Sequence, residues 1–183
     1  MGLFAILRGV AACGVMFAAG CSTLPVHDAI DAASAGQWAA RQSVAEATAR
    51  DLTAGTSGAA VKIRITHSAR VGAFSWPDGT VELTRGLVDR LDREELAAAI
   101  AHELGHVLGA REPAARSALS GRSGMPDDAE ARADRFATRL LARAGYAPEA
   151  MARTLTKVMQ SPGMTPACRA RLAKRIALLA AAP

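Results

Sequence analysis

Apolar and polar residues alternate over short stretches in the middle of the chain. Residues 61–66 alternate strictly, which predicts a half-buried strand. Residues 71–76 and 80–84 predict two further strands, and the turn residues Pro77-Asp78-Gly79 lie between them. Because consecutive short strands joined by tight turns usually pair side by side, the pattern predicts a small antiparallel sheet.

Helical periodicity covers most of the remaining chain. Apolar residues recur at intervals of three and four, and clusters of Gly, Ser and Pro separate one periodic stretch from the next. Helices are expected over residues 26–52, 92–108, 128–141, 148–160 and 166–181, the third of these following Pro126 and an Asp127 cap. The chain is therefore predicted to be a mostly helical α+β protein, with the small sheet packed beside the helix over residues 92–108.

The helix over residues 92–108 has two distinct faces. Asp92, followed three residues later by Glu95, matches a capping box at its start. One apolar face is formed by Leu96, Ile100, Leu104, Val107 and Leu108. His102 and His106 lie together well around the helix from this face, with Glu103 between them on the flank. One face thus anchors the helix while another presents two imidazoles.

Length, composition and charge favour a single domain and argue against a nucleic-acid-binding protein. A length of 183 residues fits one domain, and 50% hydrophobic with only 4% aromatic residues implies a core of Ala, Leu, Val and Ile. The net charge of +5 comes almost entirely from arginine. Because these arginines are scattered among acidic residues, without a basic run or interleaved aromatics, we favour solvated helix faces and expect no nucleic-acid partner.

Residues 1–20 have the pattern of a signal peptide. Residues 1–8 carry one positive charge, and an apolar run over residues 9–19 follows. This run is shorter than the ~20 residues that span a bilayer. The folded domain is therefore expected over residues 21–183, and no later apolar segment is long enough to span a membrane.

The end of this segment, Ala18-Ala19-Gly20-Cys21, resembles a bacterial lipobox, with Cys21 as the lipidated mature N-terminus. Ala18 stands where lipoboxes typically have Leu, so ordinary signal cleavage is the alternative. Ser22 stands where Asp usually retains lipoproteins in the inner membrane. We therefore expect a periplasmic protein held at the outer membrane by its N-terminal lipid alone.

The stretch His102-Glu103-Leu104-Gly105-His106 has the H-E-x-x-H pattern of zinc peptidases. Two histidines four apart can bind one Zn²⁺, and the adjacent glutamate can take a proton from the water that zinc activates. A helix with two packed or solvated histidines would show the same spacing. However, the chain has only 4 histidines, and two of them stand at ligand spacing around a glutamate, which favours the metal site. The glycine within this helix suggests that another backbone approaches closely there.

A catalytic zinc site usually has three protein ligands, so a third must come from elsewhere. Glu130 and Asp134 share a helix face, so one can bind zinc while the other supports a ligand histidine. Glu112 is the alternative, because residues 102–112 approach the metzincin pattern. Metzincins place His or sometimes Asp at that last position, and Pro113 follows here, so we favour Glu130.

Four blocks of the chain resemble, in the same order, the HtpX and CAAX-prenyl-endopeptidase family of zinc metallopeptidases. They are residues 72–87, residues 94–107, Glu130 with Ala133 and Asp134, and residues 144–148. Within this family, the chain resembles small periplasmic BepA-like members. The resemblance implies a zincin-type fold and a gluzincin site with one zinc ion per chain.

By the same resemblance, the zinc ligands are His102, His106 and Glu130, the catalytic base is Glu103, and Asp134 supports the ligands. The reaction implied is hydrolysis of peptide bonds by a metalloendopeptidase. Its substrates would be unfolded or misassembled envelope proteins. A zinc-stabilised, chaperone-like binding lipoprotein is the alternative. The intact glutamate of the motif argues against this alternative, since zinc binding does not require it.

The resemblance also assigns a substrate-binding strand, formed by Gly72, Ala73, Phe74 and Ser75, which would hold an extended peptide by main-chain hydrogen bonds. Two departures from the family pattern stand out. Gly72 replaces a usual Asn. Near the C-terminus, Met164-Thr165-Pro166 with Arg171 lacks the His of the family's Thr-His-Pro and Arg pattern.

Overall fold

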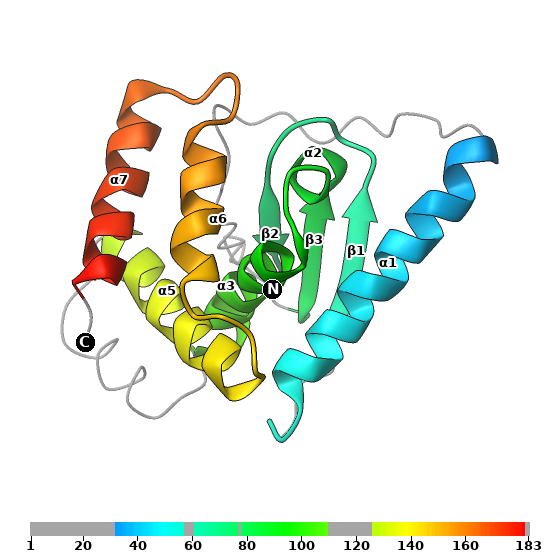
Figure 1. The fold of residues 1–183 in the computed structure, drawn as a ribbon, viewed down its shortest axis with the longest axis horizontal. Helices are drawn as coiled ribbons and strands as arrows, with labels where there is room; N and C mark the ends of the chain where they lie inside the picture. Colours follow the sequence, from blue (N-terminus) through cyan, green and yellow to red (C-terminus); the bar gives the residue numbers. More distant parts are fainter. Residues whose placement is uncertain (1–31, 57–60, 77, 110–125, 182–183) are drawn as a thin grey trace, which may run out of the picture.

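The computed structural model describes residues 32–56, 61–76, 78–109 and 126–181. Its helices are α1 (Ala32–Thr53), α2 (Arg85–Val88), α3 (Arg93–Gly109), α5 (Pro126–Arg143), α6 (Ala150–Met159) and α7 (Pro166–Ala180). Figure 1 shows a small sheet in the middle, α1 along one side, and α5, α6 and α7 on the other. The predicted α+β class, mostly helical, is confirmed. The predicted signal peptide, Cys21 and Glu112 lie outside the described residues.

The sheet differs from the prediction in the direction of one strand pair. The described residues form a three-stranded sheet from β1 (Lys62–Thr66), β2 (Ala73–Ser75) and β3 (Thr80–Thr84), in the order β1-β3-β2. β2 and β3 pair antiparallel, but β1 and β3 pair parallel. The expectation of a purely antiparallel sheet is therefore wrong, and the sheet is mixed.

Burial explains why β3 takes the central place. Its last four residues, 81–84, are all buried, as a strand covered on both faces and flanked on both edges must be. Glu82 is buried among them and is neutralised by Arg64 of β1 at 2.5 Å. A tight turn at Gly79, whose φ is 88°, sends the chain directly back from β2. β3 thereby enters between β2 and β1.

The α3 helix lies at the centre of the molecule and contacts α1, α5, α6, β2 and β3. It begins with the predicted capping box. The Asp92 N–H donates to the Glu95 carboxylate and the Glu95 N–H donates to the Asp92 carboxylate, both at 2.9 Å. Residues 97–104 are all buried, so α3 is covered nearly all round. Any side chain it presents to a site is held by the core.

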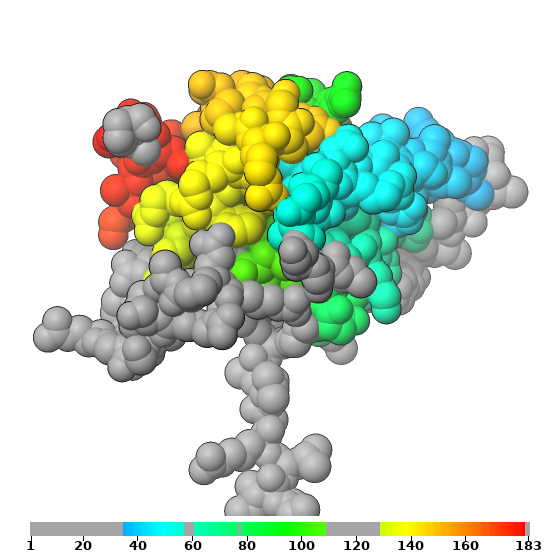
Figure 2. All heavy atoms as spheres, turned by 90° about the horizontal axis from the view of Figure 1, so that it is seen from below, coloured from blue at the N-terminus to red at the C-terminus, as the bar shows by residue number. Residues whose placement is uncertain are grey.

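The C-terminal ends of α5 and α1 lie side by side, as Figure 2 shows in yellow and cyan. Arg143 donates to the carbonyl of Leu52 at 3.4 Å and to the hydroxyl of Thr56 at 2.7 Å. The Tyr146 hydroxyl donates to Asp51 at 3.3 Å. These contacts fix the far end of α5, whose first turns carry the acidic residues that the sequence singles out.

The last two helices, α6 and α7, pack against each other, and α7 also packs on α5. The N-cap of α7 is Thr165, whose hydroxyl accepts a hydrogen bond from the Cys168 N–H. Both helices lie within a few residues of their predicted bounds. No helix in the described part of the chain is long and apolar enough to cross a membrane.

Candidate metal centre

The two histidines of α3 meet on one face of the helix. Their rings are T-shaped with centroids 4.9 Å apart, and the two Nε2 atoms lie 3.2 Å from each other. His102 is fully buried, and 10% of the His106 side chain is exposed. The spacing of four residues therefore produces the pair of imidazoles that the sequence predicts.

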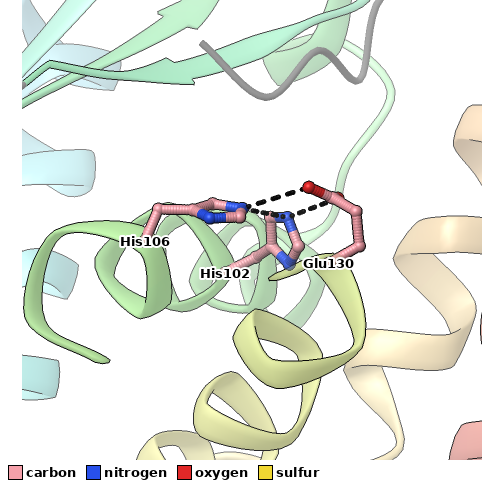
Figure 3. Close-up of side chains that lie close together, drawn as sticks. All are labelled: His102, His106 and Glu130. Carbon is pink, nitrogen blue, oxygen red and sulfur yellow. Dashed lines mark hydrogen bonds and ion pairs between the residues drawn. The ribbon is translucent and has the colours of Figure 1, made fainter. Parts of the chain in front are cut away.

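Glu130, in the first turns of α5, completes a group of three. Its Oε2 lies 3.4 Å from the Nε2 of His102, and its Oε1 lies 3.5 Å from the Nε2 of His106 (Figure 3). One ligand atom from each residue lies within 4.8 Å of the other two. Two imidazole nitrogens and one carboxylate oxygen are the ligand set of a zinc site with an open fourth position.

Asp134 lies one helical turn after Glu130 on the same face of α5. Its Oδ1 is 2.9 Å from the Nδ1 of His102. When Nδ1–H donates to this carboxylate, the lone pair of Nε2 is directed to the side where Glu130 lies. The carboxylate thus fixes both the tautomer and the orientation of the ring.

Arg175 of α7 enters the same cluster, and the sequence analysis did not single it out. It donates to both oxygens of Asp134 at 2.7 and 2.6 Å, and its Nη1 lies 2.8 Å from Oε2 of Glu130. Arg171, the arginine that follows Met164-Thr165-Pro166 in the family's C-terminal pattern, is exposed and contacts Cys168 at 3.7 Å. One sequence feature could have identified Arg175: it shares the helical spacing of the apolar residues Leu172, Ile176 and Leu179, which predicts a position on the apolar face of this helix.

Charge and burial shift the pKa values of the two histidines in opposite directions. Burial alone lowers the pKa of His102, but its hydrogen bonds to Asp134 and Glu130 outweigh burial and raise the pKa to about 9. Burial and the charge of His102 lower the pKa of His106 to about 4. The pair therefore carries one positive charge at neutral pH, and the extra proton on His102 must leave before both rings can bind a metal.

The carboxyl groups are shifted as well. Burial raises the pKa of Glu103 to about 7, against the opposing influence of His102 and the Ser75 hydroxyl. Burial also opposes ionisation of Asp134, yet its hydrogen bonds from Arg175 and His102 lower its pKa to about 2. Asp134 therefore stays ionised at neutral pH. Glu103 gains and loses a proton near pH 7, as a group that accepts and returns a proton should.

Buried oxygens without partners indicate where a ligand fits. Among the described residues, both carboxylate oxygens of Glu103 and Oε1 of Glu130 are buried and accept no hydrogen bond of normal length; the Ser75 hydroxyl is near enough to lower the pKa of Glu103 but lies beyond that length. Such atoms are costly unless a metal ion, water or substrate satisfies them. Together with the two imidazoles, these acidic groups suit zinc, so the residues present fit the metal that the motif implies.

The predicted substrate strand lies at the edge of the sheet nearest α3. β2 contacts α3 and has β3 on one side only, and no other described strand pairs with it. The Thr84 N–H donates to the carbonyl of Gly72, and the Trp76 N–H donates to the carbonyl of Thr80. Main-chain groups alternate in direction along a strand, so those of Ala73 and Ser75 point away from β3, to the open edge. Gly72 itself precedes β2 and pairs with Thr84.

A Cβ at residue 72 would lie 3.2 Å from the ring of Phe74. The usual Asn of the family would therefore require this ring to shift.

Comparison with protein-family models matches residues 37–125 to Peptidase family M48. The matched part includes α3 with His102, Glu103 and His106, and it ends before Glu130. A search of curated proteins found no match. The positions of Glu130, Asp134 and Arg175 in the site therefore rest on the structure alone.

Proposed function

We propose that this chain, a zinc metalloendopeptidase with a Peptidase family M48 domain, cleaves unfolded or misassembled proteins of the bacterial cell envelope. The observation that carries the proposal is the convergence of His102, His106 and Glu130 beside a buried Glu103 whose two oxygens have no partner in the described structure. A site that only bound zinc would have no need of a buried carboxylate without a partner.

In this proposal His102, His106 and Glu130 would hold one zinc ion per chain. The ion would supply Lewis-acid chemistry, lowering the pKa of the attacking water toward ~7 and polarising the carbonyl of the bond to be cleaved. Glu103 takes a proton from the attacking water and gives it to the leaving amine, a transfer that suits its pKa of about 7. Asp134 holds His102 in the tautomer that keeps Nε2 available.

The substrate is proposed to lie along β2. Main-chain groups of Ala73 and Ser75 at the open edge of the sheet can bind an extended peptide as an added strand. This mode of binding reads the backbone and so accepts many sequences, provided that the segment is unfolded. β2 contacts α3, and the Ser75 hydroxyl lies near enough to Glu103 to lower its pKa, so a strand added to β2 would lie close to Glu103.

The reaction is tested by digesting a reduced and alkylated, hence unfolded, protein with zinc-loaded wild type and Glu103→Gln. We expect cleavage by the wild type and a rate lower by about 10²–10⁴ in the variant, with zinc content unchanged. Glu149→Gln, at an exposed glutamate outside the site, is the matched control and should keep the wild-type rate. Equal rates for wild type and Glu103→Gln would exclude this role for Glu103.

The alternative is a zinc-stabilised, chaperone-like lipoprotein that holds clients at the edge of β2 without cleaving them. The open edge is the one observation in its favour, because it serves binding as well as cleavage. A wild type that carries zinc, suppresses aggregation of an unfolded client and cleaves none of several unfolded proteins would establish this alternative instead.

The envelope location is proposed from residues 1–21 of the sequence, with Cys21 lipidated and the domain facing the periplasm at the outer membrane. Processing should be blocked by globomycin, and Cys21→Ala should leave the membrane fraction. Release of the wild type into the soluble periplasm would favour ordinary signal cleavage. Membrane attachment that persists in Cys21→Ala would contradict a lipid anchor at this residue.

A further inference from the structure

We propose that Arg175 is a positioning residue of the metal centre, which holds Glu130 with one oxygen facing the metal and holds Asp134 against His102. The inference rests on the metal site of the proposed function and adds to it a residue from the C-terminal helix. Arg175 lies well outside residues 37–125, the part of the chain that matches the peptidase family.

The contacts of Arg175 use its guanidinium as a fork. Nε and Nη2 donate to the two carboxylate oxygens of Asp134 at 2.7 and 2.6 Å, while Nη1 lies 2.8 Å from Oε2 of Glu130. Only 10% of the Arg175 side chain is exposed, against 13% for Glu130 and 3% for Asp134. A planar group that donates in two directions fixes the relative orientation of the two carboxylates, which a point charge cannot do.

The consequence for Glu130 is that its two oxygens become different. Oε2 is held by Arg175, whereas Oε1 is buried, has no hydrogen-bond partner in the described structure and lies on the side of His106. A carboxylate held in this way presents one chosen oxygen to a metal ion. Without the fork, Glu130 would be free to rotate about its side-chain bonds.

The consequence for Asp134 concerns the orientation of His102. The same Oδ1 that accepts from Arg175 also lies 2.9 Å from the Nδ1 of His102. Because both oxygens of Asp134 are engaged by Arg175, this carboxylate cannot turn away from the imidazole. Arg175 therefore acts on two metal ligands. It contacts Glu130 directly, and it acts on His102 by way of Asp134.

The charges around the site agree with this role. Three carboxylates, those of the buried Glu103 and Asp134 and of the partly buried Glu130, lie near one buried guanidinium, that of Arg175. When all are ionised, they leave two unbalanced negative charges, which one Zn²⁺ neutralises. Removing the positive charge would itself strengthen attraction for zinc. A variant that keeps the charge and loses only the fork is therefore needed to isolate positioning.

Arg175→Lys is that variant, and Arg171→Lys is its matched control. Arg171 is the same residue type on the same helix, one turn earlier, but it is exposed and contacts only Cys168 among the interactions found for it. Zinc affinity is measured by competition with a chromophoric chelator, and the visible spectrum is recorded with Co²⁺ in place of Zn²⁺. Thermal unfolding of the metal-free proteins is measured in parallel, as a check on structure.

We expect Arg175→Lys to bind zinc about 10–100-fold more weakly than the wild type, the range typical of residues that orient metal ligands. Its Co²⁺ spectrum should change, while Arg171→Lys matches the wild type in both measurements. Wild-type zinc affinity and an unchanged spectrum in Arg175→Lys would overturn the proposal, even if thermal stability fell, because Arg175 would then be only a link between α7 and α5.

If Arg175→Lys does not fold, Arg175→Gln, which keeps two N–H donors but loses the positive charge, is measured instead. Because loss of the charge by itself favours zinc, only the Co²⁺ spectrum decides for this variant: a changed spectrum supports the proposal, and a wild-type spectrum overturns it. A wild type that binds no zinc would instead overturn the metal centre and the proposed function with it.

Discussion

Gly105 of α3 lies directly against Ala133 of α5. A Cβ at residue 105 would be 2.9 Å from both the Cα and the carbonyl oxygen of Ala133, and 3.1 Å from its Cβ. Real Cβ atoms essentially never come this close to backbone. Because Ala133 lies between Glu130 and Asp134 in the sequence, this contact sets how near both acidic residues come to the histidines.

Gly105→Ala should therefore destabilise the protein. Alanine favours the helix by about 1 kcal/mol, but the added methyl would push α3 and α5 apart, and overpacking of this kind costs about 1–3 kcal/mol. We expect a lower free energy of unfolding in urea and weaker zinc binding. Gly36→Ala in α1 is the control, since nothing lies within 4 Å of the added Cβ. Equal stabilisation by both substitutions would contradict the close contact.

Zinc binding should release a proton near neutral pH. Hydrogen bonds to Asp134 and Glu130 raise the pKa of His102 to about 9, so its protonated form competes with the metal below that pH. Zinc affinity should therefore rise by roughly tenfold per pH unit between pH 7 and 9, and level off above. Calorimetry in buffers of different ionisation enthalpy counts the proton directly.

Asp134→Asn is the companion variant for this measurement. It removes a carboxylate that raises the pKa of His102, so proton release at pH 7 should decrease and the pH dependence of zinc affinity should flatten. An affinity for the wild type that stays constant from pH 7 to 9 would show that His102 is already neutral before zinc binds.

The third ligand is tested by comparing Glu130→Gln with Glu112→Gln. Glu130 lies with both histidines, so its substitution should weaken zinc binding by more than about 100-fold, beyond the loss typical of a residue that only orients ligands. Glu112→Gln should bind zinc like the wild type. Loss of zinc only in Glu112→Gln would favour the metzincin-like arrangement.

Substrate binding along β2 predicts an effect of Ser75→Pro. Proline removes the Ser75 N–H at the open edge, and edge strands tolerate it because no partner strand needs that donor. We expect kcat/KM for an unfolded protein to decrease by roughly two- to tenfold, the equivalent of one hydrogen bond of about 0.5–1.5 kcal/mol. Ser75→Ala, which removes the hydroxyl and keeps the N–H, separates the two groups. Equal losses in both variants would argue against main-chain binding at this residue.

Features that depend on neighbouring residues could be predicted from the sequence. The capping box of Asp92 and Glu95 forms as expected, and the helical spacing of His102 and His106 brings their rings together. β3 has the predicted bounds. Such features follow from the pitch of a helix or the alternation of a strand, which a short stretch of chain determines by itself.

Strand direction could not be predicted in this way. The sequence placed three strands next to one another along the chain, but β3 lies between β1 and β2, which makes the β1–β3 pair parallel. The choice depends on how the strands pack against the helices: α1 contacts β1, and α3 contacts β2 and β3. The sequence of a strand by itself does not specify which strands pair with it.

The sequence by itself determined the motif helix, the pair of histidines and the acidic candidates Glu130 and Asp134. Tertiary structure decided which of the distant charged residues meet that helix. Arg171 and Arg175 are one turn of α7 apart. Arg175 binds Asp134 of α5, whereas Arg171 is exposed and contacts Cys168. The physical reason is that a buried guanidinium is stable only where carboxylates surround it, and those carboxylates come from a helix about 40 residues away in sequence.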